Sequence, residues 1–137
     1  MIETDIKKSI TTIHVPTCQE SIHFNQEKIT ILHCKYLVSG KGAFNLLPTT
    51  FLYEEDNSRR QILHAYNAAI SPNWTEYFTF YDFIHFTLIF EGLSKNCKKF
   101  YLNEHSKNIG LLSFWSNDIE RNHSDVYEVE LFNRKVV

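Results

Sequence analysis

The segment FIHFTLIF at residues 83–90 restricts the possible folds more than any other part of the sequence. Large apolar side chains alternate along it with a second set that includes a histidine and a threonine, and this period of two is typical of a β-strand with one buried face. The side chains predicted to be buried are Ile84, Phe86, Leu88 and Phe90, and those predicted to face outward are His85, Thr87 and Ile89. The sequence therefore predicts a central β-strand in this region.

Other segments have the same strand character. Residues 28–38, KITILHCKYLV, are dominated by residues that favour β-structure. Their apolar residues change from one face of the strand to the other along the segment, which indicates either that both faces are covered or that a bulge interrupts the strand. The sequence SGKG at residues 39–42 predicts a turn, and residues 61–70 could form a short helix, although a strand that runs into a loop before Pro72 is preferred. Together with shorter runs, these segments predict about seven to nine strands at the spacing of an all-β sandwich or barrel.

The chain has 137 residues, no internal repeat and no flexible linker, so one domain is expected to span residues 1–137. Within this domain, residues 1–8 could be disordered. The net charge of −2, with both signs spread along the chain, gives no basis for a nucleic-acid partner or for binding to an anionic membrane. No apolar run reaches the length of a membrane span, so a soluble protein is expected.

The cysteines are few and irregularly spaced. Cys18, Cys34 and Cys97 are odd in number, and no two of them have the C-x-x-C spacing of a metal or redox site. A disulfide framework is therefore not expected. Three free thiols and a cytoplasmic, reducing location are predicted.

The segment FTLIFEGLSKNCKKFYLNE at residues 86–104 combines an F-T-L-x-F-x-x-L pattern with a basic turn and an apolar strand that ends in glutamate. The residues that carry this pattern are Phe86, Thr87, Leu88, Phe90, Leu93, Phe100, Leu102 and Glu104. With its flanks, over residues 47–131, the chain resembles uncharacterised immunoglobulin-like β-sandwich domains of bacterial proteins. The resemblance implies an all-β, antiparallel, immunoglobulin-like sandwich of about seven to nine short strands. It implies no activity, because these are packing motifs.

His85 is the first candidate for chemistry, with Glu91 or Glu104 as a carboxylate partner. On one strand, His85 and Glu91 would share the outer face but lie about 20 Å apart at the usual strand rise. That separation is too long for joint acid–base work. No spaced set of ligands accompanies His85, so neither a metal nor a cofactor is predicted.

His123 and Asp125 are two residues apart and could share one face of a strand, as half of a nucleophile-activating set. The surrounding Asn and Ser residues favour a turn instead. Cys97 stands beside lysines that could lower its pKa, but no base is placed near it. No catalytic residue is therefore assigned, and an enzyme that uses His123 with Asp125, or Cys97, stays open as an alternative.

Aromatic residues are concentrated in NWTEYFTFYDF, residues 73–83. They could pack in the core or form an exposed ligand or carbohydrate platform, and the residues expected to bind such a ligand are Trp74, Tyr77, Phe80 and Tyr81. The leading interpretation is a non-enzymatic module that binds a protein partner or another copy of itself. The alternatives are a small-ligand or carbohydrate binder that uses this aromatic segment, and an enzyme of unrecognised type.

Overall fold

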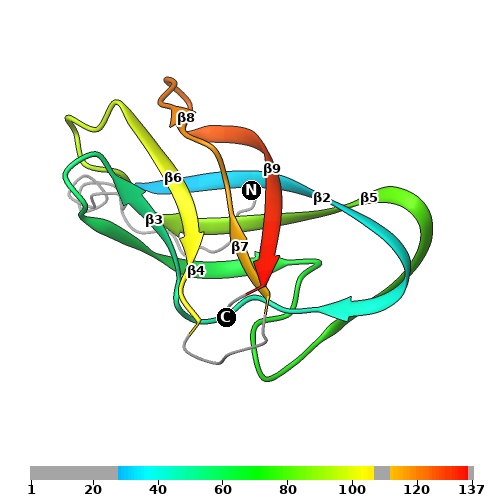
Figure 1. Cartoon of the computed structure of the whole chain (residues 1–137). Helices are drawn as coiled ribbons and strands as arrows, with labels where there is room; N and C mark the ends of the chain where they lie inside the picture. Colours follow the sequence, from blue (N-terminus) through cyan, green and yellow to red (C-terminus); the bar gives the residue numbers. More distant parts are fainter. Residues whose placement is uncertain (1–27, 107–111, 136–137) are drawn as a thin grey trace, which may run out of the picture.

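Eight strands make up the regular structure of the part of the chain that the computed structural model describes, residues 28–106 and 112–135 (Figure 1). They are β2 (Ile29–Phe44), β3 (Thr50–Glu54), β4 (Arg59–Tyr66), β5 (Thr75–Glu91), β6 (Lys99–Glu104), β7 (Leu112–Trp115), β8 (Ile119–Glu120) and β9 (Val126–Lys135). No helix occurs among the described residues, which confirms the all-β class. The expectation for residues 1–8, and that for Cys18, lie outside the described residues.

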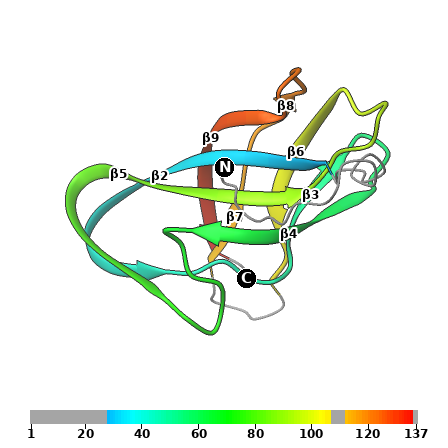
Figure 2. The same cartoon turned by 180° about the vertical axis from the view of Figure 1, so that it is seen from behind.

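The strands close into a barrel. Neighbouring strands follow the order β3-β4-β5-β2-β9-β7-β6, and β6 returns to pair with β3, so that seven strands form a ring to which β8 adds a short edge (Figures 1 and 2). The closing pair is antiparallel, with Thr50 opposite Glu104 and Glu54 opposite Phe100. The prediction of an immunoglobulin-like β-sandwich is therefore wrong, because a sandwich keeps two separate sheets whereas here one sheet closes on itself.

Two further details contradict the sandwich. β2 pairs in parallel with β9, from Ile31 opposite Val126 to Tyr36 opposite Leu131, so the sheet is not wholly antiparallel. β2 and β5 contain 16 and 17 residues, and they are therefore not short strands. Alternation of apolar residues determines which face of a strand is buried, but it does not determine which strands become neighbours.

The interior of the barrel is one continuous apolar core. Phe86, Leu88 and Phe90 are at most 2% exposed, which confirms the inner face predicted for this strand, although Ile84 is only half-buried. Aromatic rings pack edge-to-face within the core, with 4.9 Å between the ring centroids of Tyr36 and Phe114. The other fully buried apolar side chains are Leu32, Leu46, Leu52, Leu102, Phe100, Phe114 and Leu131.

A bulge in β5 divides the long β2–β5 pair into two parts. Val38 lies opposite Asp82 and Gly40 opposite Thr79, so two consecutive residues, Phe80 and Tyr81, face the single residue between Val38 and Gly40. Tyr81 has φ of 50° and Gly40 has φ of 93°, which are left-handed conformations typical of a bulge. The turn predicted at residues 39–42 is therefore wrong, because Gly40 serves a bend within a strand pair.

Beyond the bulge, residues 38–44 of β2 and 75–82 of β5 continue as a two-stranded ribbon, which we call the arm. Figures 1 and 2 show the arm curving out from the barrel and back toward it. Phe44, at the end of the arm in β2, returns to the core and packs 5.3 Å from the ring centroid of Phe86. The arm is thus fixed to the barrel at both ends, and its bent middle projects outward.

The segment after β4 agrees with the preferred interpretation of the sequence. β4 ends at Tyr66, and an irregular loop follows that contains a cis peptide bond between Ser71 and Pro72. Ile70 in this loop forms an isolated parallel bridge with Leu46, which follows the end of β2. The loop therefore leads the chain from the barrel wall into the arm.

Candidate functional site

The aromatic residues predicted to bind a ligand lie along the arm, but they do not converge on one cavity. Phe80 and Tyr81 are 84% and 73% exposed at the bulge, and Trp74, just before β5, is 59% exposed. Tyr77 points the other way. Its ring lies 6.5 Å from that of Phe44, and its phenol lies directly against Gly42. These four side chains therefore occupy different faces and positions of the arm.

Sequence reasoning missed Phe78, which is 72% exposed and whose ring lies 6.0 Å from that of Phe80. Its place two residues before Phe80 on the same strand was the available signal, since residues two apart share a face. Phe78, Phe80 and Tyr81 together form what we call the aromatic corner. It is open to solvent, because the bulge turns two consecutive rings outward.

Neither long edge of the arm is covered by another strand among the described residues. β9 pairs with β2 only as far as Tyr36, and β4 pairs with β5 only over Thr87–Phe90. The backbone groups on the outer edges of residues 75–82 and 38–44 therefore have no ladder partner in the described structure. Such edges are templates on which another extended chain can pair.

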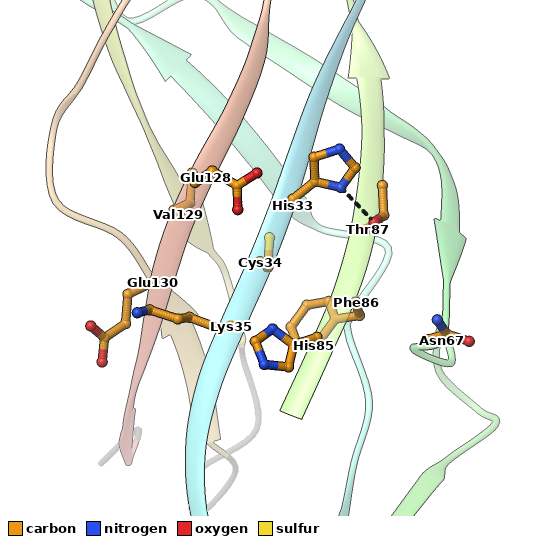
Figure 3. Close-up of a pocket in the computed structure, with 10 residues that line it drawn as sticks. All are labelled: His33, Cys34, Lys35, Asn67, His85, Phe86, Thr87, Glu128, Val129 and Glu130. Carbon is orange, nitrogen blue, oxygen red and sulfur yellow. Dashed lines mark hydrogen bonds between the residues drawn. The ribbon is translucent and has the colours of Figure 1, made fainter. Parts of the chain in front are cut away.

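A second feature is a shallow groove of about 460 Å³ on the outside of the barrel, over β2, β5 and β9 (Figure 3). Strand alternation turns Cys34, Phe86 and Val129 toward the core and leaves their neighbours on the outer face. The outward-facing lining residues on these three strands are His33, Lys35, His85, Thr87, Glu128 and Glu130. The register places His33 between Thr87 and Glu128, and Lys35 between His85 and Glu130.

The groove brings histidines and carboxylates to one face, but not in the predicted combination. The predicted partners of His85 are engaged elsewhere: Glu91 accepts a hydrogen bond from the Gln61 N–H at 2.8 Å, and Glu104 is buried at the opposite wall of the barrel. The carboxylates that do line the groove come from β9, whose parallel pairing with β2 the sequence does not reveal. As predicted, His85, Glu91 and Glu104 do not converge.

The chemistry of the groove is that of a polar surface. His33 Nδ1 lies 2.9 Å from Thr87 Oγ1, which orients the imidazole, while the Lys35 ammonium lies 4.6 Å from the centroid of the Phe83 ring. Burial, together with the charge of Glu128, raises the pKa of Cys34 far above its usual range, so this thiol offers no nucleophile. No cluster of metal ligands occurs in the described part of the chain.

The third feature is a hollow of about 680 Å³ at one end of the barrel, which we call the basic hollow. It brings together Cys97, His123 and Asp125, the candidates of the enzyme alternative. Asp125, however, is fully engaged: its two carboxylate oxygens accept hydrogen bonds from Arg121 at 3.0 and 3.1 Å, and one also accepts the Tyr127 hydroxyl at 2.8 Å. No hydrogen bond joins Asp125 to His123 among the described residues.

The environment of Cys97 does not activate its thiol. Burial, and next the charge of Glu54, raise the pKa of Cys97 above its usual value, which lowers the thiolate fraction at neutral pH. Its Sγ donates a hydrogen bond to the Lys99 carbonyl at 3.4 Å. Residues 122–125 form a turn in which Asp125 N–H donates to Asn122 Oδ1, as the Asn and Ser content predicted. The hollow therefore contains the parts of a nucleophilic site without the contacts that would activate them.

Titration of the thiols provides a direct check on the cysteine assignment. Cys34 and Cys97 are both free and buried in the described structure. Unfolding the protein without a reductant is expected to expose three titratable thiols. In the folded protein, Cys34 and Cys97 should react with the same thiol reagent at least tenfold more slowly at neutral pH, since both thiols are shielded and have a raised pKa. A count of one after unfolding would reveal a disulfide and contradict the prediction.

No protein family, characterised protein or solved structure that we compared matches this chain. The resemblance to bacterial immunoglobulin-like domains therefore stays a prediction, while the sandwich architecture that it implied is replaced by the barrel. Among the described residues, no helix is both long and apolar enough to cross a membrane.

Proposed function

We propose that this protein is a non-enzymatic, cytoplasmic binding module that associates with a protein partner, or with a second copy of itself, through the arm. The observation that carries the proposal is the aromatic corner. Three large rings, those of Phe78, Phe80 and Tyr81, are each more than two-thirds exposed on one bent ribbon. Exposed apolar groups that cluster in this way are typical of interaction surfaces, and aromatic residues are enriched there.

The backbone of the arm supports the same function. Its outer edges present hydrogen-bonding groups beside the aromatic rings, so a partner strand could pair with the edge while its side chains pack on the rings. The arm is anchored by Phe44 in the core, which keeps this surface in place before a partner binds. Pre-organisation of this kind reduces the entropic cost of association.

The geometry favours a protein partner over a small ligand. Pockets for small ligands are concave and enclose most of the ligand, whereas the rings of the aromatic corner are each more than two-thirds exposed. Tyr77, which would have to complete a ligand platform, faces Gly42 and Phe44 instead. The enzyme alternative receives less support, because neither the groove nor the basic hollow contains an activated nucleophile.

The proposal is tested by a variant that removes two rings of the corner, Phe78→Ser with Phe80→Ser. Self-association is measured by sedimentation over a range of protein concentrations, and partners are compared by affinity capture from a lysate followed by identification. The double variant is expected to weaken the association at least tenfold and to leave the melting temperature within a few degrees of wild type, since exposed rings contribute little to stability.

The matched control is Leu63→Ser with Tyr66→Ser. These residues are also large and exposed, at 55% and 51%, but they lie on β4, away from the arm. The control should associate as the wild type does. Equal losses in both double variants, or unchanged association in the arm variant, would contradict the proposal.

A further inference from the structure

The basic hollow brings together basic side chains from three separate segments of the chain. Lys28 precedes β2, Lys95 and Lys98 lie in the connection between β5 and β6, and His123 lies in the turn before β9. None of these four side chains makes an ion pair or a hydrogen bond with another described residue. The whole protein carries a net charge of −2, so the basic groups around the hollow differ in sign from the net charge of the protein.

Two of the described acidic groups near the hollow, Asp125 and Glu54, are paired with arginines. Asp125, the carboxylate that lines it, is held by the bidentate contact with Arg121, so these two charges offset one another. Glu54 pairs with Arg60 at 2.7 Å. Glu55 accepts a hydrogen bond from the backbone N–H of Lys98 at 2.9 Å but does not line the hollow. The three lysine side chains therefore form no ion pair with a described residue.

The framework that holds these groups is well connected. The guanidinium of Arg121 donates to the carbonyls of Ser94 and Cys97 as well as to Asp125, which ties the β5–β6 connection to the turn before β9. Lys28 is fixed against the same connection, because its backbone lies so close to Gly92 that no side chain would fit there. The basic groups are thus brought together by the fold and not by a single mobile loop.

We infer that the basic hollow binds a small anion that bears two or more phosphate groups. Ammonium groups bind phosphate oxygens as point charges, and clustered like charges on concave surfaces concentrate ligands of the opposite charge. Three lysines without an ion pair to a described residue, around an open hollow of about 680 Å³, suit a di- or triphosphate group better than a single carboxylate. The site is separate from the arm, so this inference does not depend on the proposed function.

The experiment uses sodium pyrophosphate as the probe and the complete chain at 0.15 M salt, about the physiological ionic strength that screens weak surface contacts. Binding is followed by calorimetry, and the site is located by the shifts of backbone amide resonances. Saturable binding with a dissociation constant below about 1 mM is expected, with the largest shifts at residues 94–98 and 121–125. Lys95→Ala with Lys98→Ala should weaken binding at least tenfold.

The matched control, Lys35→Ala with Lys99→Ala, removes the same amount of charge from exposed lysines that do not line the hollow, and it should bind as the wild type does. Equal loss in both double variants would mean nonspecific attraction and would overturn the site. Two other sources of phosphate are compared directly: vesicles that contain phosphatidylserine, and a single-stranded oligonucleotide of twelve thymidines. Binding to either of these without binding to pyrophosphate, or amide shifts that lie outside the hollow, would overturn the inference.

Discussion

Replacing Phe86 with alanine is expected to lower the free energy of unfolding by about 3–5 kcal/mol, the usual cost of removing a buried phenylalanine ring. Phe86 is 2% exposed and packs against Phe44, the residue that anchors the end of the arm to the core. The variant therefore loses apolar contacts in the barrel and, in addition, weakens the attachment of the arm. Chemical denaturation, followed by circular dichroism, measures the change.

Phe78→Ala is the matched control, because it makes the same chemical change on the same strand at a side chain that is 72% exposed. Its expected cost is within about 0.5 kcal/mol, as for most surface substitutions. The contrast tests the bulge directly, since Phe78 and Phe86 have the same parity in the sequence and would share a face on an uninterrupted strand. Similar losses in the two variants would contradict the assigned orientation of β5.

A second large effect is expected at Glu104, which is 2% exposed at the end of β6. Its oxygens accept the Leu47 N–H at 2.7 Å, the Thr50 hydroxyl at 2.7 Å and the Phe114 N–H at 3.1 Å. Glu104→Ala would leave the Leu47 and Phe114 N–H groups without an acceptor, while the Thr50 hydroxyl could still donate to the Leu47 carbonyl, 2.7 Å away. Since each buried donor left unpaired costs about 1–3 kcal/mol, a total loss of about 3–5 kcal/mol is expected.

Glu104→Gln separates the hydrogen bonds from the charge. Its amide oxygen can retain the contacts with Leu47 and Thr50, and only the Phe114 N–H loses its acceptor, so a smaller loss of about 1–2 kcal/mol is expected. Urea unfolding of both variants at one pH shows which of them loses more of its free energy of unfolding. A Glu104→Gln variant that is as unstable as Glu104→Ala would contradict the role assigned to these hydrogen bonds.

The pH dependence of the free energy of unfolding should distinguish the two buried glutamates, Glu54 and Glu104. Burial raises the pKa of Glu104 and outweighs the hydrogen bonds that lower it, so the folded state binds this proton more tightly than the unfolded state does. The stability that this difference contributes is present below the unfolded-state pKa, about 4.3, and is lost as the pH rises through the folded-state value. Hence the stability of wild type relative to Glu104→Gln should fall as the pH rises from about 4.

Glu54 should behave in the opposite way. Burial alone would raise its pKa, but hydrogen bonds from Arg60 and Ser94 outweigh burial and lower it. Its contribution is therefore present above the unfolded-state pKa and is lost as the pH falls through the folded-state value. Unfolding of Glu54→Gln and Glu104→Gln across acidic pH should give slopes of opposite sign relative to wild type, and slopes of the same sign would contradict one of the two assignments.

The sequence predicts the strands more reliably than it predicts their partners. The inner face of residues 83–90 follows from alternation, because the side-chain period of a strand is local. The barrel depends on the pairs β3–β6 and β2–β9, which join segments far apart in the chain and leave no local signal. Gly40 shows the same limit: the sequence SGKG predicts a turn, but in the structure Gly40 adopts a left-handed conformation opposite a bulge.

The candidate surfaces were also predictable only where they depend on local sequence and not on which strands pair. Trp74, Phe80 and Tyr81 are aromatic residues in a polar context, and the sequence identified them as candidates for an exposed surface. The inward orientation of Tyr77 depends on the space above Gly42, which only the paired strand defines. The basic hollow could not be predicted, because the nonlocal pairing of β2 with β9 is what brings Lys28 near His123.

The parallel pairing of β2 with β9 has a consequence for biosynthesis. A ribosome releases β2 first among the described strands and β9 last, yet these strands are neighbours in the barrel wall, joined from Ile31 opposite Val126 to Tyr36 opposite Leu131. Until β9 emerges, none of the other described strands pairs with that edge of β2. Such late, nonlocal closure slows folding and prolongs the exposure of apolar surface. Translation that stops before β9 would therefore release a chain suited to aggregation or to chaperone binding, and not a smaller barrel.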